Sequence, residues 1–361
     1  MTSDKTIVSV TGYGSTGSSA VVDFLKSQSE VEVADDFEFQ AHYFPDTIRD
    51  LDYKLNEVCA RHYDSDLAIV RFLDVFKKLE KWYEPAFHGK LYGLAEEYID
   101  SLNPIKWSGY WAYDRLNFSS EQMAAIDKEN EKIAKKRYYI HQFNRVRRKI
   151  GLPLITEPVD KAYFTPRTMY LCSRPDDFIL KTQNFTSRLL DFVAKTDKNI
   201  LVVNMLLPPN CPQYYNKYFA NPVKSIVVSK DPRDLFVQKN ITKWKVVPYE
   251  DVDTFIKWYD ALMRDEVNEK DKSVLNIKFE DLIYEFESTA KRICDFLGLD
   301  NSNIASEDFD PHVSVINTQV WKRYPEYNAQ VAKIESELKK YLYDFNNHKE
   351  VAYTGTTGKA F

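Results

Sequence analysis

Residues 6–25 read TIVSVTGYGSTGSSAVVDFL, and this stretch decides the fold. It begins with a β-like run from Thr6 to Val10, continues through a glycine- and serine-rich loop from Gly12 to Ser19, and ends in an apolar helical segment. Glycines let such a loop turn its N–H groups inward, and the N-terminus of the following helix adds partial positive charge. The stretch therefore predicts a strand, a phosphate-binding loop and a helix. An ordinary turn between a strand and a helix is the alternative.

The loop departs from the two common nucleotide-binding patterns. Gly12 and Gly17 have the spacing of the Walker A pattern, but Ser18 stands where that pattern requires Lys. Without this Lys a nucleoside triphosphate lacks its main cation at the β- and γ-phosphates, which disfavours a kinase or NTPase. Gly12, Gly14 and Gly17 also match the glycines of the dinucleotide fingerprint, but no acidic residue at a second strand end unambiguously completes it.

Other apolar runs predict the rest of an α/β fold. Their continuous apolar character fits parallel strands that are covered on both faces. The predicted strands are residues 7–10, 31–34, 200–203, 225–228 and 274–277. A helix is expected over about 285–297, with Gly298 as its terminator. A last helix is expected to carry on one face Val331, Ile334, Leu338, Tyr341, Leu342 and Phe345.

These elements predict a three-layer, P-loop-like α/β domain with a central parallel sheet. We expect residues 1–350 to form this single domain. Residues 47–195 have a helical pattern, are rich in Tyr and Trp, and contain a densely charged segment from Lys128 to Lys149. They are interpreted as a large helical insertion, and residues 351–361 are expected to be a disordered tail.

Composition limits the partners and the compartment. The chain has 49 Lys and Arg against 54 Asp and Glu, a net charge of −5, which argues against a general binder of nucleic acid or anionic membranes. No apolar stretch approaches the roughly 20 residues of a transmembrane helix, and the N-terminus lacks a signal-peptide pattern. The scattered cysteines form no metal-like pair. We therefore expect a cytoplasmic protein with no transmembrane segment and no nucleic-acid partner.

Three segments, in order along the chain, resemble motifs of the PAPS-dependent sulfotransferases (PAPS is 3′-phosphoadenosine 5′-phosphosulfate). Residues 16–19, TGSS, match the last four positions of the 5′-phosphosulfate loop, [RK]-S-G-[TS]-[TS]. Residues 224–234, KSIVVSKDPRD, are similar to the family's strand ending in R-D-P-R-D. Residues 273–282, SVLNIKFEDL, followed by FLGL at 296–299, are similar to its Y-E-D-L and F-L-G-L segment.

Two further features are similar to bacterial members of the family that modify polysaccharides. They are LLPPN at residues 206–210 and the pattern Ser314-x-x-Asn317-x-x-x-Trp321. The resemblance implies that PAPS, the sulfuryl donor, binds across the strand ends. The donor-binding residues that it implies are Gly14, Ser15, Thr16, Gly17, Ser18, Ser19, Lys230, Gln238 and Lys322. In relatives, the basic residue at the position of Lys230 contacts the 3′-phosphate, helped by a Ser eight residues later.

The chain departs from the family at two of these positions. Ser15 stands where relatives have the Arg or Lys that supports the bridging oxygen during transfer, and Gln238 replaces the helping Ser. Losing the loop cation removes an electrostatic stabilisation of a few kcal/mol at the transition state. Either another cation substitutes for it, or the protein is slow or inactive. The candidate cations, each of which has a solvated surface charge as the alternative, are Lys243, Lys245, Arg145, Arg147 and Arg148.

The acceptor hydroxyl needs a general base, and the segment after the second predicted strand offers candidates. Sulfotransferases acting on sugars often use a Glu near this place, so Glu38 is the expected base, with His42 and Asp36 in reserve. By the same resemblance a saccharide or glycolipid is the expected acceptor, and the aromatic middle of the chain suits either sugar stacking or plain helix packing. This chemistry needs no metal.

Two other functions stay open. A P-loop nucleotide kinase is the first alternative, and the missing Walker Lys counts against it. A non-catalytic protein that binds PAPS or a nucleotide is the second, and Ser15 is the reason to consider it.

Overall fold

A computed structural model of the chain describes residues 5–34, 38–58, 62–160, 166–264, 271–300, 304 and 306–347. The chain divides into two compact units. The first is made of Met1–Tyr53, Arg71–Leu102 and Asp176–Phe361, and the second of Lys54–Val70 and Asn103–Pro175. The expected tail at 351–361 and the reserve base Asp36 lie outside the described residues.

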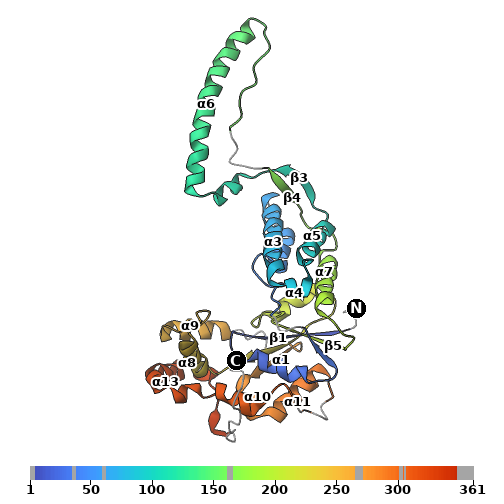
Figure 1. The fold of residues 1–361 in the computed structure, drawn as a ribbon, viewed down its shortest axis with the longest axis vertical. Helices are drawn as coiled ribbons and strands as arrows, with labels where there is room; N and C mark the ends of the chain where they lie inside the picture. The colour runs from blue at the N-terminus through green and yellow to red at the C-terminus, as the bar shows by residue number, and fades with distance from the viewer. Residues whose placement is uncertain are drawn as a thin grey trace. The chain divides into compact units, whose positions relative to one another are not determined.

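A five-stranded parallel sheet forms the centre of the first unit (Figure 1). Its strands are β1 (Thr6–Gly12), β2 (Val31–Val33), β5 (Ile200–Asn204), β6 (Lys224–Ser229) and β7 (Val274–Lys278). They lie in the order β2-β5-β1-β6-β7, and in β1 Val8 pairs with Val202 on one side and Lys224 on the other. All five predicted strands and the α/β fold class are confirmed.

Helices cover both faces of this sheet. Figure 1 shows α1 (Ser18–Lys26), α10 (Phe279–Tyr284) and α11 (Phe286–Leu297) on one side, and α4 (Glu84–Phe87), α5 (Leu91–Ser101) and α7 (Phe178–Val193) on the other. Val8 and Val10 of β1 pack with apolar residues of α1, α10 and α11 in one buried cluster. Helix α11 ends as predicted, because Gly298 adopts a left-handed φ of 79° and donates its N–H to the carbonyl of Cys294 at 2.8 Å.

Further elements belong to the first unit or to its connections with the second. The remaining helices are α2 (Ile48–Asp52), α3 (His62–Trp82), α8 (Pro232–Thr242), α9 (Val252–Met263), α12 (Pro311–Ser314) and α13 (Asn328–Glu337). A π-helix, η1, spans Tyr53–Val58. The 3-10 turns are η3 (Pro212–Tyr218), η5 (Val315–Asn317), η6 (Val320–Arg323), η7 (Pro325–Tyr327), η8 (Lys339–Tyr341) and η9 (Phe345–Asn347). No described helix is long and apolar enough to cross a membrane.

The last helix is shorter than its apolar pattern predicts. Helix α13 ends at Glu337, so Val331 and Ile334 lie on it, whereas Tyr341, Leu342 and Phe345 lie beyond its end. The backbone there makes tertiary contacts that a continuing helix would prevent. The N–H of Tyr343 donates to Asp231 at 2.8 Å, and the carbonyl of Leu342 accepts from Lys278 at 3.2 Å.

The second unit contains an antiparallel strand pair and a long helix. Strands β3 (Ile105–Gly109) and β4 (Arg167–Leu171) pair with each other, and η2 (Ala112–Asn117) leads into α6 (Ser120–Lys149). The returning chain lies along α6, because the side chain of Asn144 bonds both the N–H and the carbonyl of Ile155, at 2.9 and 2.7 Å. The predicted insertion at 47–195 therefore contains two strands besides its helices, and its residues contribute to both units. The single domain over residues 1–350 remains a prediction.

Candidate donor site

A cavity of about 580 Å³ opens at the carboxyl ends of the strands in the first unit. Residues from the loop after β1, from the ends of β5 and β6, and from the segments around Glu38 and Trp244 line it together. The lining residues are Gly12, Tyr13, Gly14, Ser15, Gly17, Ser18, Ser19, Glu38, Gln40, Tyr43, Asn204, Met205, Pro209, Lys230, Trp244, Val246, Phe279 and Asn317. This is the place where open α/β sheets bind ligands.

The loop between β1 and α1 has the conformation of a phosphate cradle. Gly14, Ser15 and Gly17 all have left-handed φ angles, of 84°, 56° and 93°. A side chain at Gly17 would overlap the ring of Phe279, so only glycine fits there. No side chain caps the N-terminus of α1, and its first turn contains no acidic residue. The first N–H groups of α1 therefore lack the side-chain acceptor that would compete with an anion.

Thr16 differs from the other five predicted loop residues, which all line the cavity. Its hydroxyl donates to the carbonyl of Val228 at 2.6 Å and accepts from the N–H of Tyr13 at 3.1 Å. Its side chain is buried and is not among the residues that line the cavity. The Thr16 hydroxyl therefore fixes the loop to β6. Only the backbone of Thr16 is left for a ligand to contact.

Lys230 and Gln238, predicted to serve the same phosphate, lie together. Lys230 follows β6 and lines the cavity, and its Nζ donates to Oε1 of Gln238 at 3.0 Å. The ammonium also lies 5.1 Å from the centre of the Phe279 ring. Burial lowers the pKa of Lys230, and the carboxylates of Asp234, Glu280 and Asp231 oppose that shift. A second cavity of about 390 Å³, at the ends of β6 and β7, also has Lys230 in its lining.

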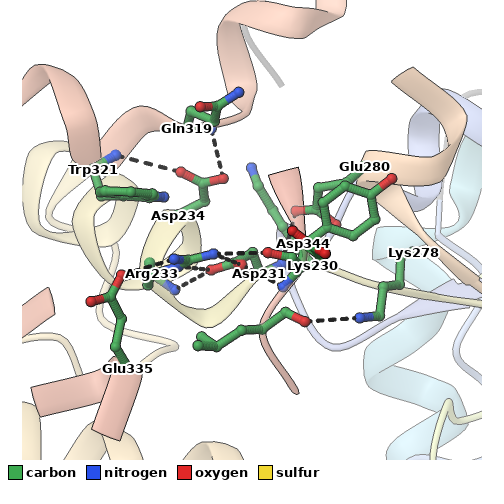
Figure 2. A network of polar contacts seen from close by, with 12 residues as sticks. Lys230, Asp231, Arg233, Asp234, Lys278, Glu280, Gln319, Trp321, Glu335 and Asp344 are labelled. Atoms are coloured by element: carbon green, nitrogen blue, oxygen red, sulfur yellow. Dashed lines mark hydrogen bonds and ion pairs between the residues drawn. The ribbon is translucent and has the colours of Figure 1, made fainter. Parts of the chain in front are cut away.

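A network of charged residues fixes the backbone that directly follows Lys230 (Figure 2). Arg233 donates to both carboxylate oxygens of Asp231, at 3.0 and 2.7 Å, and to Glu335 at 2.8 Å. Asp231 also accepts the N–H of Tyr343, and its own N–H donates to Glu280 at 2.9 Å. These contacts join the start of α8 to α10, α13 and the C-terminal segment, so the Lys230 backbone has a fixed position.

Asp234 adds a further anchor to this network. It accepts the N–H groups of Gln319 and Val320, at 2.8 and 2.5 Å. Burial raises the pKa of Asp234 to about 7, while the charge of Lys230 works against that rise. Burial also raises the pKa of Glu280.

Two amide side chains in the cavity wall have buried polar atoms without a hydrogen-bond partner among the described residues. Nδ2 of Asn317, whose side chain is 7% exposed, and Oδ1 of Asn204 have no hydrogen-bond partner among the described residues. A buried polar atom without a partner is costly, and a ligand in the cavity would satisfy it. Asn317 belongs to the Ser314 to Trp321 pattern noted in the sequence.

Of the two described candidates for the general base, only Glu38 lines the cavity. Glu38 is exposed, and its carboxylate accepts a hydrogen bond from Gln40 at 2.7 Å. His42 is 1% exposed and packs against the rings of Phe39 and Phe219, with centroids 5.3 and 5.1 Å away. Burial lowers the pKa of His42 to about 3, so its ring stays neutral at physiological pH.

None of the predicted cations other than Lys230 lines the cavity. Lys322 is exposed on η6, bonds Gln319, and does not line the cavity. Lys243 lies over the ring of Tyr249, and Lys245 pairs with Glu250 at 3.2 Å. The three arginines lie on α6 in the second unit: Arg145, Arg147 and Arg148.

The cation that does contact the loop is one that the sequence analysis missed. Lys239, on α8 directly after Gln238, donates from Nζ to the hydroxyl of Ser15. Its place directly after Gln238, a predicted donor-binding residue, could have suggested it. The sequence could not show, however, that the Lys239 side chain points toward the loop. Within the described residues there is no group of three or more His, Cys, Asp or Glu that could hold a metal ion.

Comparisons with known proteins bear on this site. Residues 210–343, a little over a third of the chain, match the sulfotransferase domain, and this stretch contains the motifs at 224–234 and 273–282 but not the loop at 16–19. A search of curated proteins found no match. A solved structure, mouse sulfotransferase SULT7A1 complexed with PAP, is 20% identical over 48% of this chain, with a TM-score of 0.22. The alignment spans 57% of the mouse protein.

Proposed function

We propose that this chain, whose residues 210–343 match the sulfotransferase domain, transfers the sulfuryl group of PAPS to a hydroxyl group of an acceptor. One observation carries the proposal: the loop after β1 and Lys230, which lies in the matched domain, line the same cavity. The fold thus offers a phosphate cradle and a separate buried cation to one ligand. A donor with phosphate groups at both its 5′ and 3′ positions needs both.

Each end of the donor has its own set of groups. The N–H groups of the loop and of the first turn of α1, with the hydroxyls of Ser18 and Ser19, would hold the 5′-phosphosulfate. Lys230 and Gln238 would hold the 3′-phosphate, since their polar ends are 3.0 Å apart. Nδ2 of Asn317, which has no partner among the described residues, would supply a further donor.

The reaction is an in-line displacement at sulfur. The acceptor oxygen forms a new bond to sulfur while the bond from sulfur to the bridging oxygen breaks, and that oxygen's electron pair leaves with adenosine 3′,5′-bisphosphate (PAP). Glu38 would take the proton of the acceptor hydroxyl, because it is the carboxylate on the cavity wall that carries no ion pair among the described residues. The remaining rate enhancement would come from positioning the two reactants and from hydrogen-bond donors around the sulfuryl oxygens.

We assign a saccharide or glycolipid as the acceptor. Glu38 shares the cavity wall with the amide of Gln40, the phenol of Tyr43 and the indole of Trp244. Burial raises the pKa of Tyr43, so its phenol remains a hydrogen-bond donor. Polar groups beside aromatic faces suit a ring that carries several hydroxyls.

A calorimetric titration tests the donor assignment. PAP, the desulfated product, should bind with micromolar affinity, whereas ATP with Mg²⁺ and adenosine 5′-monophosphate should bind much more weakly. Preference for ATP would replace the proposal with the kinase alternative. Binding of PAP without turnover of PAPS over a panel of sugar acceptors would favour the non-catalytic alternative.

A further inference from the structure

Lys239 places a buried positive charge at the loop position where the family's cation is missing. Its Nζ donates to the Ser15 hydroxyl, and its side chain is 4% exposed. The ammonium lies 4.2 Å from the centre of the Trp244 ring. Ser15 and Trp244 both line the cavity, whereas Lys239 does not, so its ammonium lies directly behind these two lining residues.

This ammonium has no counter-ion in the part of the chain that the structure describes. Among the described residues, no carboxylate lies within ion-pair distance of Lys239, and the charge that acts on it is that of Lys230, which has the same sign. Burial and Lys230 lower the pKa of Lys239 to about 8. An unpaired buried ammonium is costly, which is why buried charges normally have partners. The cost is removed if an anion binds at the loop.

We propose that Lys239 replaces the loop cation absent at Ser15, binding the 5′-phosphosulfate and stabilising the negative charge that develops on the bridging oxygen as the sulfuryl group leaves. This assignment rests on the proposed function. The cation comes from α8 and not from the loop, and Ser15 holds the ammonium in place through its hydroxyl. Gln238 and Lys239 are neighbours on α8, so one helix would set the positions of groups at both ends of the donor.

Substitutions at Lys239 test its role in catalysis. Lys239→Met keeps the length of the side chain and removes its charge, and it should lower kcat for sulfuryl transfer by about 10²-fold or more. Lys239→Arg should retain part of the rate. The double variant Ser15→Lys/Lys239→Met returns a cation to the loop itself and should recover part of what Lys239→Met loses. Lys257→Met, at an exposed lysine on α9 that lines neither cavity, is the control and should keep the wild-type rate.

Binding of PAP gives a readout that does not depend on turnover. Because the Lys239 pKa is about 8 in the free protein, PAP binding should take up protons between about pH 8 and 9.5, and the affinity should fall over that range. Calorimetry in two buffers of different ionisation enthalpy measures this uptake, which should disappear in Lys239→Met. If the Lys239→Met variant binds PAP and transfers the sulfuryl group as well as an active wild-type protein does, the inference is overturned. Absence of PAP binding to the wild type would overturn the proposed function instead.

Discussion

At the scale of single residues, the site depends on where each polar side chain points. Glu38 and His42 are four positions apart, yet one lines the cavity and the other is enclosed by aromatic rings. The sequence identified both as candidates, because residue type and position after a strand are visible in it. It could not separate them, because burial depends on packing partners such as Phe219, which lies far along the chain.

Glu38→Gln tests the base at this scale. The amide keeps the shape of the side chain but cannot take the proton, so transfer should fall about 10²-fold or more while PAP affinity stays near the wild-type value. Steady-state rates with a sugar acceptor, set beside calorimetric affinities, measure the two effects separately. A variant with the wild-type rate would remove Glu38 from the mechanism.

At the scale of elements, the strands and the phosphate loop could be predicted because their signals are local. Continuous apolar runs gave all five strands, and glycine spacing gave the loop. The predicted end of α13 was wrong. The apolar pattern continues past Glu337, but the backbone there forms hydrogen bonds with the side chains of Asp231 and Lys278, which a continuing helix would prevent. Lys239 was missed for a related reason, since the direction of a side chain on α8 depends on how that helix packs.

Gly17→Ala tests how tightly the loop packs against α10. The new methyl group would overlap the ring of Phe279, and the left-handed φ of 93° adds strain for any side chain. PAP affinity should fall by more than tenfold, and the melting temperature should drop. Gly89→Ala is the matched control, because Gly89 also has a positive φ, of 70°, but nothing lies within 4 Å of its added methyl group. If both variants lose the same stability and neither loses PAP affinity, the contact with Phe279 is unimportant.

At the scale of the whole molecule, the strand order explains how distant segments meet. The phosphate-loop strand β1 lies between β5 and β6, so the loop at 12–19 meets the ends of strands near residues 204 and 230. Because the strands are parallel, all these carboxyl ends lie on one edge of the sheet. This arrangement is expected from the sequence, since it predicts parallel strands and the family resemblance places the donor across their ends. The antiparallel pair β3 and β4 had no comparable signal, because exposed residues make up most of β3.

The free energy of unfolding is a property of the whole molecule, and His42 should make it depend on pH. The imidazole pKa is lowered to about 3 in the folded protein, against about 6.5 in the unfolded chain, so between these values the unfolded chain binds more protons. Stability should therefore fall as pH drops below about 6.5, and His42 alone should cost about 2 kcal/mol by pH 5. Urea unfolding of His42→Leu at pH 7 and pH 5 measures this contribution, because the variant lacks the titrating group and should lose less stability than the wild type over that interval. The same variant should retain sulfuryl transfer at pH 7, in contrast to Glu38→Gln. An unchanged pH slope in His42→Leu would mean that the ring gains a proton without unfolding, and the buried aromatic cage around it would then be open to water.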